Sequence, residues 1–239
     1  MKVLPLINTA LLLFLLYFVF TTRQQGNTAI QEEIKAERLS IVGPDGHLYM
    51  SISNPARQAL ATHNGKPIDT NETERDLPGI MFFNRTGDEV GGIYYDGTDS
   101  SSIQGITFDQ MNNDQVMAIM KDEYYEGDEI KRWYGMYFRE RSDSITRYQF
   151  IKNIQKELKT IEEEAEKKEK LAKYTRLLNE EIDTYRLFLG REENEEVGLF
   201  LFDSKGRERI KIYVDAEDRA RLVVLDSLGN KKDLGEVLR

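Results

Sequence analysis

The chain of 239 residues contains no cysteine and only two histidines, His47 and His63. The absence of cysteine excludes disulfides, thiolate nucleophiles and cysteine-based zinc or iron–sulfur sites. His47 directly follows Asp45-Gly46 in a predicted turn, and His63 lies in a polar stretch. Because neither has a metal-ligand or triad partner beside it in the sequence, we expect surface roles for both.

The common motifs of enzymes are also absent. The chain has no Gly-x-Gly-x-x-Gly after a strand, no Gly-x-x-x-x-Gly-Lys-Ser/Thr, no His-Glu-x-x-His and no Gly-x-Ser-x-Gly. Among 42 acidic residues some pair will fall within the spacing that glycoside hydrolysis requires, so such a pair carries no information. We therefore predict a non-enzymatic protein with no catalytic, cofactor-binding or metal-binding residues.

Positive charge is in deficit, since 33 Lys and Arg stand against 42 Asp and Glu, a net charge of -9. A surface of that sign repels phosphate backbones, which makes nucleic acid a poor partner.

Residues 3–20 form the most apolar stretch of the chain, and 11–20 are uninterrupted Leu, Phe, Tyr and Val. Eighteen residues of helix span roughly 27 Å, enough for a hydrocarbon core. The alternative is a cleaved secretory signal, but 18–23 hold no Ala-x-Ala pattern. We predict an uncleaved single-pass anchor over 1–22, with the N-terminus in the cytoplasm and the bulk of the chain outside.

A polar stalk over 23–37 precedes a region of short alternating apolar runs over 38–143, and the pattern returns over 185–239. Such runs, separated by turn residues, predict β-hairpins. We expect hairpins from 39–42 with 48–53, 80–83 with 90–95, 103–108 with 116–120, and 197–202 with 210–214. The segment 57–78 is polar and is predicted to be a long surface loop.

Three turns share one form: Asn84-Arg85-Thr86-Gly87, Asp203-Ser204-Lys205-Gly206 and Asp226-Ser227-Leu228-Gly229. The first residue of such a turn accepts hydrogen bonds from the turn backbone, and the glycine takes a left-handed conformation. They indicate a degenerate repeat of hairpins.

Calcium is a second interpretation of the acidic turns. Its candidate oxygen ligands are Asp109, Asn112, Asn113, Asp114, Asp203 and Asp226. No twelve-residue loop of the EF-hand form is present, so ordinary Asx turns are the preferred interpretation. In adjacent aromatic pairs, such as Trp133-Tyr134 and Tyr137-Phe138, neighbours point to opposite faces, so one of each pair is expected in the core. An exposed row of the others could bind a sugar or a partner sheet, but cross-strand packing is the preferred interpretation.

Glycine and proline are missing from 136–189, although they punctuate the rest of the chain. This predicts one long charged helix over 144–184, with Ser144 or Asp143 as the N-cap. Its stripe at Ile151, Ile154 and Leu158 is spaced as in a coiled coil, and the register shifts after the charged 162–170. We expect this helix to bind a protein partner or a second copy.

Three segments carry a resemblance to known proteins. They are 37–46 (ERLSIVGPDG), 79–89 (GIMFFNRTGDE) and 108–116 (FDQMNNDQV). They resemble a group of uncharacterised bacterial proteins with an N-terminal anchor and a repetitive β domain. The resemblance implies a bacterial origin and a location in the cell envelope, and it implies no activity. The long helix departs from it.

The predicted fold is mainly β, an antiparallel meander of about ten to twelve strands, closed as a barrel or open as an elongated sheet, with one inserted helix. The predicted function is a membrane-anchored, extracytoplasmic structural or protein-interaction module. The alternative is a protein that binds carbohydrate polymers of the envelope, or a hydrolase that uses an Asp/Glu pair.

Overall fold

The computed structural model describes residues 11–18, 32–68 and 76–235. The chain divides into two compact units, Met1–Ala36 and Glu37–Arg239. In the first unit, residues 11–18 are helical, and 32–36 contain no helical turn. Across the described residues, no helix reaches the length and apolarity needed to cross a membrane. Most of the predicted anchor, and residues 23–31 of the predicted stalk, lie outside the described ranges.

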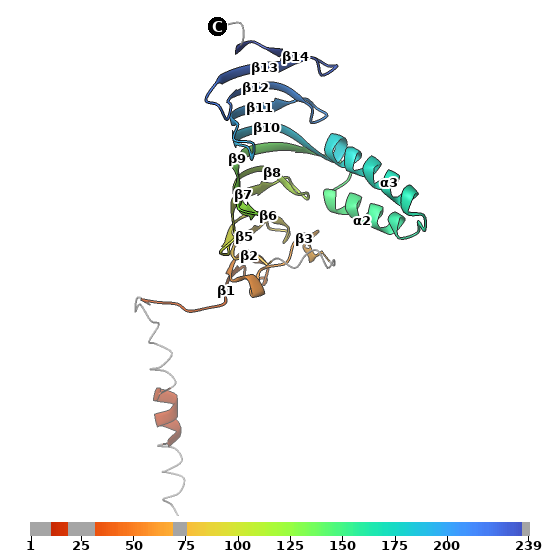
Figure 1. Cartoon of the computed structure of the whole chain (residues 1–239). Helices are drawn as coiled ribbons and strands as arrows, with labels where there is room; N and C mark the ends of the chain where they lie inside the picture. Colours follow the sequence, from red (N-terminus) through yellow and green to blue (C-terminus); the bar gives the residue numbers. More distant parts are fainter. Residues whose placement is uncertain (1–10, 19–31, 69–75, 236–239) are drawn as a thin grey trace, which may run out of the picture. The chain divides into compact units, whose positions relative to one another are not determined.

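The second unit is built on one antiparallel sheet whose strands lie in the order in which they follow along the chain, apart from β3 (Thr62–His63) and β4 (Lys66–Pro67), which form a separate pair (Figure 1). Its twelve strands are β1 (Arg38–Val42), β2 (Leu48–Ser53), β5 (Gly79–Phe83), β6 (Glu89–Gly97), β7 (Ser101–Asp109), β8 (Gln115–Glu126), β9 (Glu129–Arg141), β10 (Asp183–Arg191), β11 (Val197–Phe202), β12 (Glu208–Val214), β13 (Ala220–Leu225) and β14 (Lys231–Asp233). The predicted meander and its four hairpins are confirmed. The sheet is open, with β1 and β14 as its edges, so the elongated arrangement is the one observed.

One turn form closes most of the hairpins. In each of these turns the N–H of the first residue donates to the carbonyl of the fifth, and the N–H of the fourth donates to the carbonyl of the first. The fourth residue has a positive φ. The six turns begin at Gly43, Asn84, Glu192, Asp203, Asp215 and Asp226. The turn at Asp215 has Asp218 in the left-handed position, with φ 59°. The repeat is therefore broader than the glycine-containing turns indicate, because Asp also tolerates this conformation.

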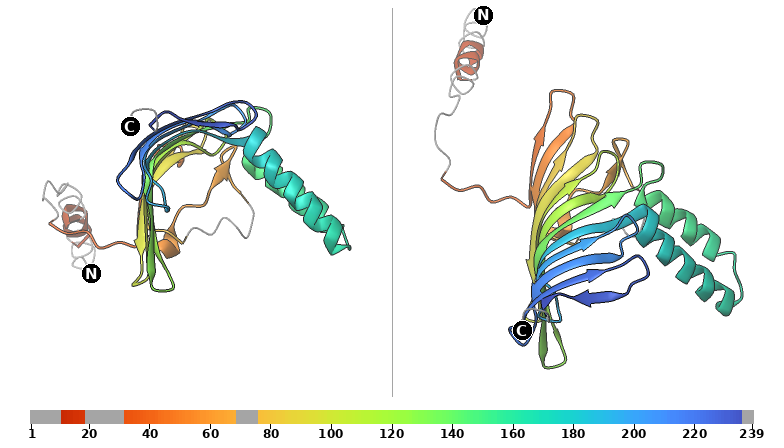
Figure 2. Two further views of the ribbon diagram at one scale, coloured as in Figure 1. Left: turned by 45° about the horizontal axis from the view of Figure 1, so that its top comes forward. Right: turned by 90° about the horizontal axis from the view of Figure 1, so that it is seen from above.

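The single long helix predicted over 144–184 is wrong. The segment instead folds back on itself as α2 (Arg147–Leu158) and α3 (Glu164–Leu177), followed by the π-helix η2 (Leu178–Ile182). Figures 1 and 2 show the two helices side by side, projecting from the sheet between β9 and β10. The N-cap is Thr146, whose hydroxyl accepts the Gln149 N–H in a capping box, and not Ser144 or Asp143.

An aromatic contact and polar contacts between α2 and α3 stabilise the reversal. Phe150 and Tyr174 meet edge to face with ring centroids 6.4 Å apart, and the Tyr174 hydroxyl donates to Glu157. Lys170 also pairs with Glu157 at 2.8 Å. The shift of register around 162–170 thus marks a turn, made without glycine or positive φ among its residues.

The prediction of a polar surface loop over 57–78 is also wrong in part. Residues 55–57 form the 3-10 helix η1 (Pro55–Arg57), and β3 (Thr62–His63) pairs with β4 (Lys66–Pro67). Gln58 and Ala59 are buried against the sheet, because the Gln58 side-chain carbonyl accepts hydrogen bonds from Ser53 and Ser51. The described strand β3 lies inside the arc of the curved sheet (Figure 2).

Candidate interaction surface

The two faces of the sheet differ in how they bury apolar side chains. One face, here called the aromatic face, carries the buried row Ser51, Met81, Gly92, Thr107, Ala118, Tyr137, Phe188, Phe200, Lys211 and Val223, whose members pair directly across adjacent strands. Phe200 and Ala118 are fully buried. This face holds the core clusters of the domain.

The aromatic rings achieve this burial by lying flat on neighbouring strands. Trp133 stacks on Phe188 with centroids 5.4 Å apart, and Phe188 on Phe200 at 5.6 Å. Glycines leave room beneath the rings, since a Cβ at Gly105 would lie 2.6 Å from the Tyr94 ring and one at Gly135 would meet Phe188. Aromatic side chains that cover strand glycines can thus form a core on a single sheet. Burial raises the pKa of Tyr94 to about 12.

The opposite face carries an exposed aliphatic ladder. One residue from each of eleven consecutive strands lies in a single cross-strand row: Leu39, Ile52, Ile80, Ile93, Ile106, Ile119, Met136, Leu189, Leu199, Ile212 and Leu222. Ile119 is 50 % exposed, Ile212 49 % and Leu189 47 %. Period-two alternation places these residues on the face opposite the buried row.

A second apolar row runs beside the ladder on the same face. It consists of Ile41, Met50, Phe82, Gly91, Phe108, Met117, Phe138, Leu187, Leu201, Ile210 and Val224, again paired strand to strand. We call the two rows together the ladder face. None of these positions carries a charged or hydrogen-bonding side chain. Contiguous exposed apolar surfaces of this kind mark interaction sites in soluble domains.

On β6 to β9 the ladder face is hollowed. A shallow depression of about 710 Å³ lies between the ladder residues Ile93, Ile106 and Ile119 and a more polar row that includes Tyr95 and Tyr134. Tyr95 is 63 % exposed and Tyr134 43 %. Exposed tyrosines at the border of an apolar patch resemble the composition of protein interfaces.

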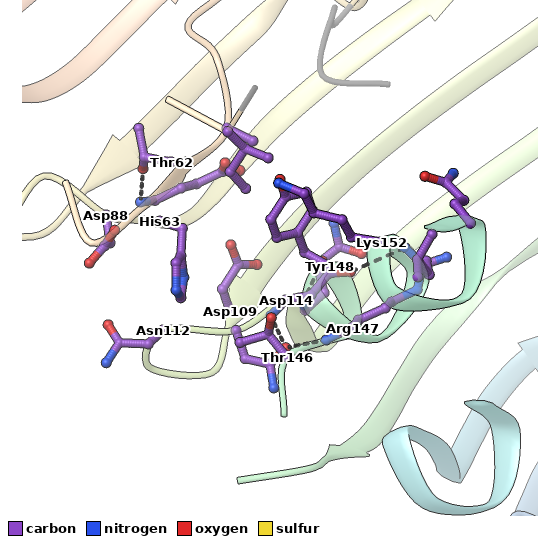
Figure 3. A pocket seen from close by; sticks show the side chains of 17 residues that line it. Thr62, His63, Asp88, Asp109, Asn112, Asp114, Thr146, Arg147, Tyr148 and Lys152 are labelled. Atoms are coloured by element: carbon purple, nitrogen blue, oxygen red, sulfur yellow. Dashed lines mark hydrogen bonds and ion pairs between the residues drawn. The ribbon is translucent and has the colours of Figure 1, made fainter. Parts of the chain in front are cut away.

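A second candidate site is a pocket of about 400 Å³ at one end of the strands. Figure 3 shows His63, Asp88 and Asn112 on one side of the pocket, Asp109 and Asp114 in the middle, and Arg147, Tyr148 and Lys152 on the α2 side. The pocket thus combines carboxylates, basic groups and one aromatic ring.

The pocket carboxylates make contacts within the protein. Asp88 Oδ1 accepts the Gly65 N–H at 2.8 Å, and Asp88 Oδ2 accepts the Thr86 hydroxyl at 3.3 Å. Asp114 pairs with Arg141 at 3.6 Å and with Arg147 at 3.8 Å.

Beside the pocket, a buried ionic cluster fixes the base of the helical pair. Asp183 Oδ2 lies 2.7 Å from Arg141 and 2.8 Å from Arg139, and Arg147 approaches it at 3.5 Å. Burial by itself lowers the pKa of Arg139. The neighbouring Tyr185 and Asp183 have a larger effect in the opposite direction, so the pKa of Arg139 is raised. Because an ion buried in this way is costly to leave unpaired, the cluster holds β9, β10 and the start of α2 together.

The six candidate calcium ligands do not form one set, because Asp203 and Asp226 lie in separate turns away from the other four. Asp203 Oδ1 accepts the N–H groups of Lys205 and Arg207, and Asp226 Oδ1 accepts those of Leu228 and Asn230. Of the remaining predicted ligands, Asp109 and Asn112–Asp114 all line the 400 Å³ pocket. Within the described ranges, no group of three or more His, Cys, Asp or Glu could hold a metal ion.

The two histidines lie apart. His47 Nδ1 is 2.9 Å from Asp45 Oδ2 in the first turn, whereas His63 lines the 400 Å³ pocket. The sequence did not predict the ladder face, although the apolar residues of the eleven strands that form it were visible. The missing information was the register, which aligns these residues into one row.

Comparison of the chain with protein-family models, with curated proteins and with solved structures finds no significant match. The case for function therefore depends on the surfaces of this molecule alone.

Proposed function

We propose that this protein is a membrane-anchored, extracytoplasmic interaction module without enzymatic activity, whose ladder face binds another protein chain. The observation that carries the proposal is the pair of uninterrupted apolar rows across eleven strands, with side chains such as Ile119 half exposed. Leaving such a surface in water is unfavourable by about 25 cal/mol per Å². The apolar run 11–20 supports the anchor, and its flanking charges support an N-terminus in the cytoplasm.

The helical segment 144–184 remains a proposed second contact. Its stripe residues Ile151, Ile154 and Leu158 are half buried, and the neighbouring Phe150 packs against Tyr174 of α3. The ladder face has apolar side chains such as Ile119, Leu189 and Ile212 about half exposed, which favours the sheet as the main contact.

The proposal is tested by photo-crosslinking in membranes of cells that produce the full-length protein. A benzophenone amino acid at Ile119 is expected to give discrete protein adducts. The same group at Leu228, which is 86 % exposed in the β13–β14 turn, serves as the control and is expected to give few. Equal yields from both positions, or none from Ile119, would contradict the proposal.

A second candidate function is binding of an envelope carbohydrate polymer in the 400 Å³ pocket, or its hydrolysis by an Asp/Glu pair. The observation in its favour is the pocket itself, where Tyr148 faces carboxylates that include Asp88 and Asp109. An aromatic ring beside carboxylates suits sugar recognition and glycoside hydrolysis.

Calorimetric titration with soluble envelope glycans tests this candidate. Tyr148→Ala should abolish binding, whereas Tyr125→Ala, at a position 53 % exposed on β8, should leave it unchanged. Absence of heat with the wild-type protein, together with intact glycan after incubation, would exclude it.

A further inference from the structure

We propose that the partner of the ladder face is the same face of a second copy of this chain, so that two single-layer sheets form one β-sandwich. The inference rests on the proposed function, since it names the occupant of the same surface.

The size of the ladder face fits this partner. Eleven strands at about 4.8 Å spacing, and two rows about 7 Å apart, give a patch roughly 50 Å by 14 Å. That area, on the order of 700 Å², is close to the roughly 800 Å² that each chain buries in a standard stable interface. One face therefore supplies enough apolar surface for a dimer.

The chemistry of the ladder face also matches itself. Both rows are free of charged side chains, and the charges beside them are neutralised within the chain. Glu123 contacts Lys121 and Arg132, each at 2.6 Å, and Arg191 pairs with Glu195 at 2.9 Å. No opposite charge is required from a partner, and an equally aliphatic surface is the best complement.

The continuity of the row is compatible with this pairing. The ladder passes from strand to strand without a gap, and a two-fold axis through its middle residue, Ile119, would set one ladder against the other. Sheets packed face to face in this way lie about 10 Å apart with interdigitated side chains. The described segments that leave the sheet, 55–68 and α2, contact the aromatic face at Ser51 and Asp183, so they leave the ladder face open.

A membrane surface is a poorer occupant of the same face. The net charge of -9, with Asp203 and Asp226 in turns at one end of the strands, is repelled by anionic lipids. Tethering by the proposed anchor would instead raise the effective concentration of copies and favour their pairing.

The absence of native cysteine makes a direct test possible in the full-length protein. Single-cysteine variants Ile119→Cys and Leu228→Cys are oxidised in isolated membranes, and covalent dimers are separated on denaturing gels. Ile119→Cys is expected to form disulfide-linked dimer at least tenfold more than Leu228→Cys.

Sedimentation of the full-length protein in density-matched detergent provides the second measurement. The wild-type protein should sediment as a dimer, Ile119→Lys as a monomer, and the control Leu228→Lys as a dimer. Both substitutions are at exposed positions, and circular dichroism verifies that the sheet remains.

Each result separates the two proposals. A monomeric wild-type protein without Ile119→Cys dimers, whose benzophenone adducts at Ile119 contain another protein, would overturn the second copy and keep the interaction module. Adducts that contain only lipid would overturn both. A dimer that survives Ile119→Lys would place self-association elsewhere, and would also overturn the inference.

Discussion

Individual residues maintain a core on the aromatic face, most of which no second layer covers within the described part of the chain. Gly135 is the clearest example, because the ring of Phe188 occupies the space that its side chain would take. Lys211 covers a second ring: its ammonium group lies 5.1 Å from the centre of the Phe200 ring and 2.8 Å from Glu196. Glycines that make room for the rings, and long amphipathic side chains that lie over them, thus bury the aromatic core in place of a second layer.

Gly135→Ala is expected to destabilise the domain by about 1–3 kcal/mol, the usual cost of overpacking. The new methyl group would displace Phe188 and the stacked Trp133. Urea denaturation followed by Trp133 fluorescence measures the effect. Gly46→Asn is the control, since φ is 82° there, no atom lies within 4 Å of a Cβ, and Asn tolerates this conformation. Equal stability of the two variants would contradict the proposed role of Gly135.

The Asx turns depend on the side chain of their first residue, which accepts hydrogen bonds from the turn backbone. Burial raises the energy of the Asp203 carboxylate, but N–H groups of Lys205 and Arg207 and the guanidinium of Arg209 hold its pKa well below the ordinary value. A carboxyl with a lowered folded-state pKa stabilises the protein above its unfolded pKa, and that contribution is lost as pH falls through the folded pKa.

Asp203→Ala should therefore lower the free energy of unfolding by about 1–2 kcal/mol at neutral pH, because two backbone donors lose their acceptor. The difference from wild type should shrink once the pH falls below about 4, the unfolded pKa of Asp. Chemical denaturation at pH 7 and pH 3 tests both statements. Asp99→Ala, in the exposed β6–β7 turn, is the matched control. A difference that grows in acid would refute this account.

At the scale of elements, the α2–α3 pair is an insertion into an otherwise regular hairpin. β9 and β10 are already paired at Arg141 and Asp183, and the Ser142 N–H bonds the Ile182 carbonyl at 3.1 Å. The pairing of β9 with β10 is therefore complete before α2 begins, and the helices are not needed to set the register of the sheet.

Replacing residues 143–181 by Asn-Gly should leave a folded sheet, because a two-residue turn fits the end of β9 and β10. Circular dichroism is expected to lose its helical component and keep cooperative thermal unfolding. A replacement by eight Gly and Ser residues controls for turn strain. Loss of cooperative unfolding in both variants would show that the helices hold the sheet together. A dimer that persists after the deletion would assign self-association to the sheet.

At the scale of the whole molecule, dimerisation links stability to concentration. A dimer that unfolds to separate chains is stabilised by mass action, whereas a monomer is not. The melting temperature of the full-length protein should rise by several degrees between micromolar and hundred-micromolar concentration.

Ile119→Lys should remove that dependence, and Leu228→Lys should retain it. Differential scanning calorimetry at three concentrations provides the measurement. A wild-type melting temperature independent of concentration would contradict dimerisation of the folded domain.

The sequence by itself determined the local structure. Alternating apolar runs and turns such as Asp203 to Gly206 specified the hairpins, because their stereochemistry is confined to a few neighbouring residues. It also determined the absence of cysteine chemistry and the acidic charge. The sequence pattern could not show where α2 ends, because the reversal uses ordinary backbone angles and depends on the contact of Phe150 with Tyr174.

Only the tertiary structure decided the ladder face. From the sequence alone, a buried core position is expected for Ile93, Ile106 and Ile119, and equally for the aromatic residues. Strand register aligned the aliphatic residues into one row, and glycines such as Gly135 let the rings cover the opposite face. The physical reason is that burial is a property of strands brought together from distant parts of the chain, so no single strand reveals which of its two faces stays exposed to a partner.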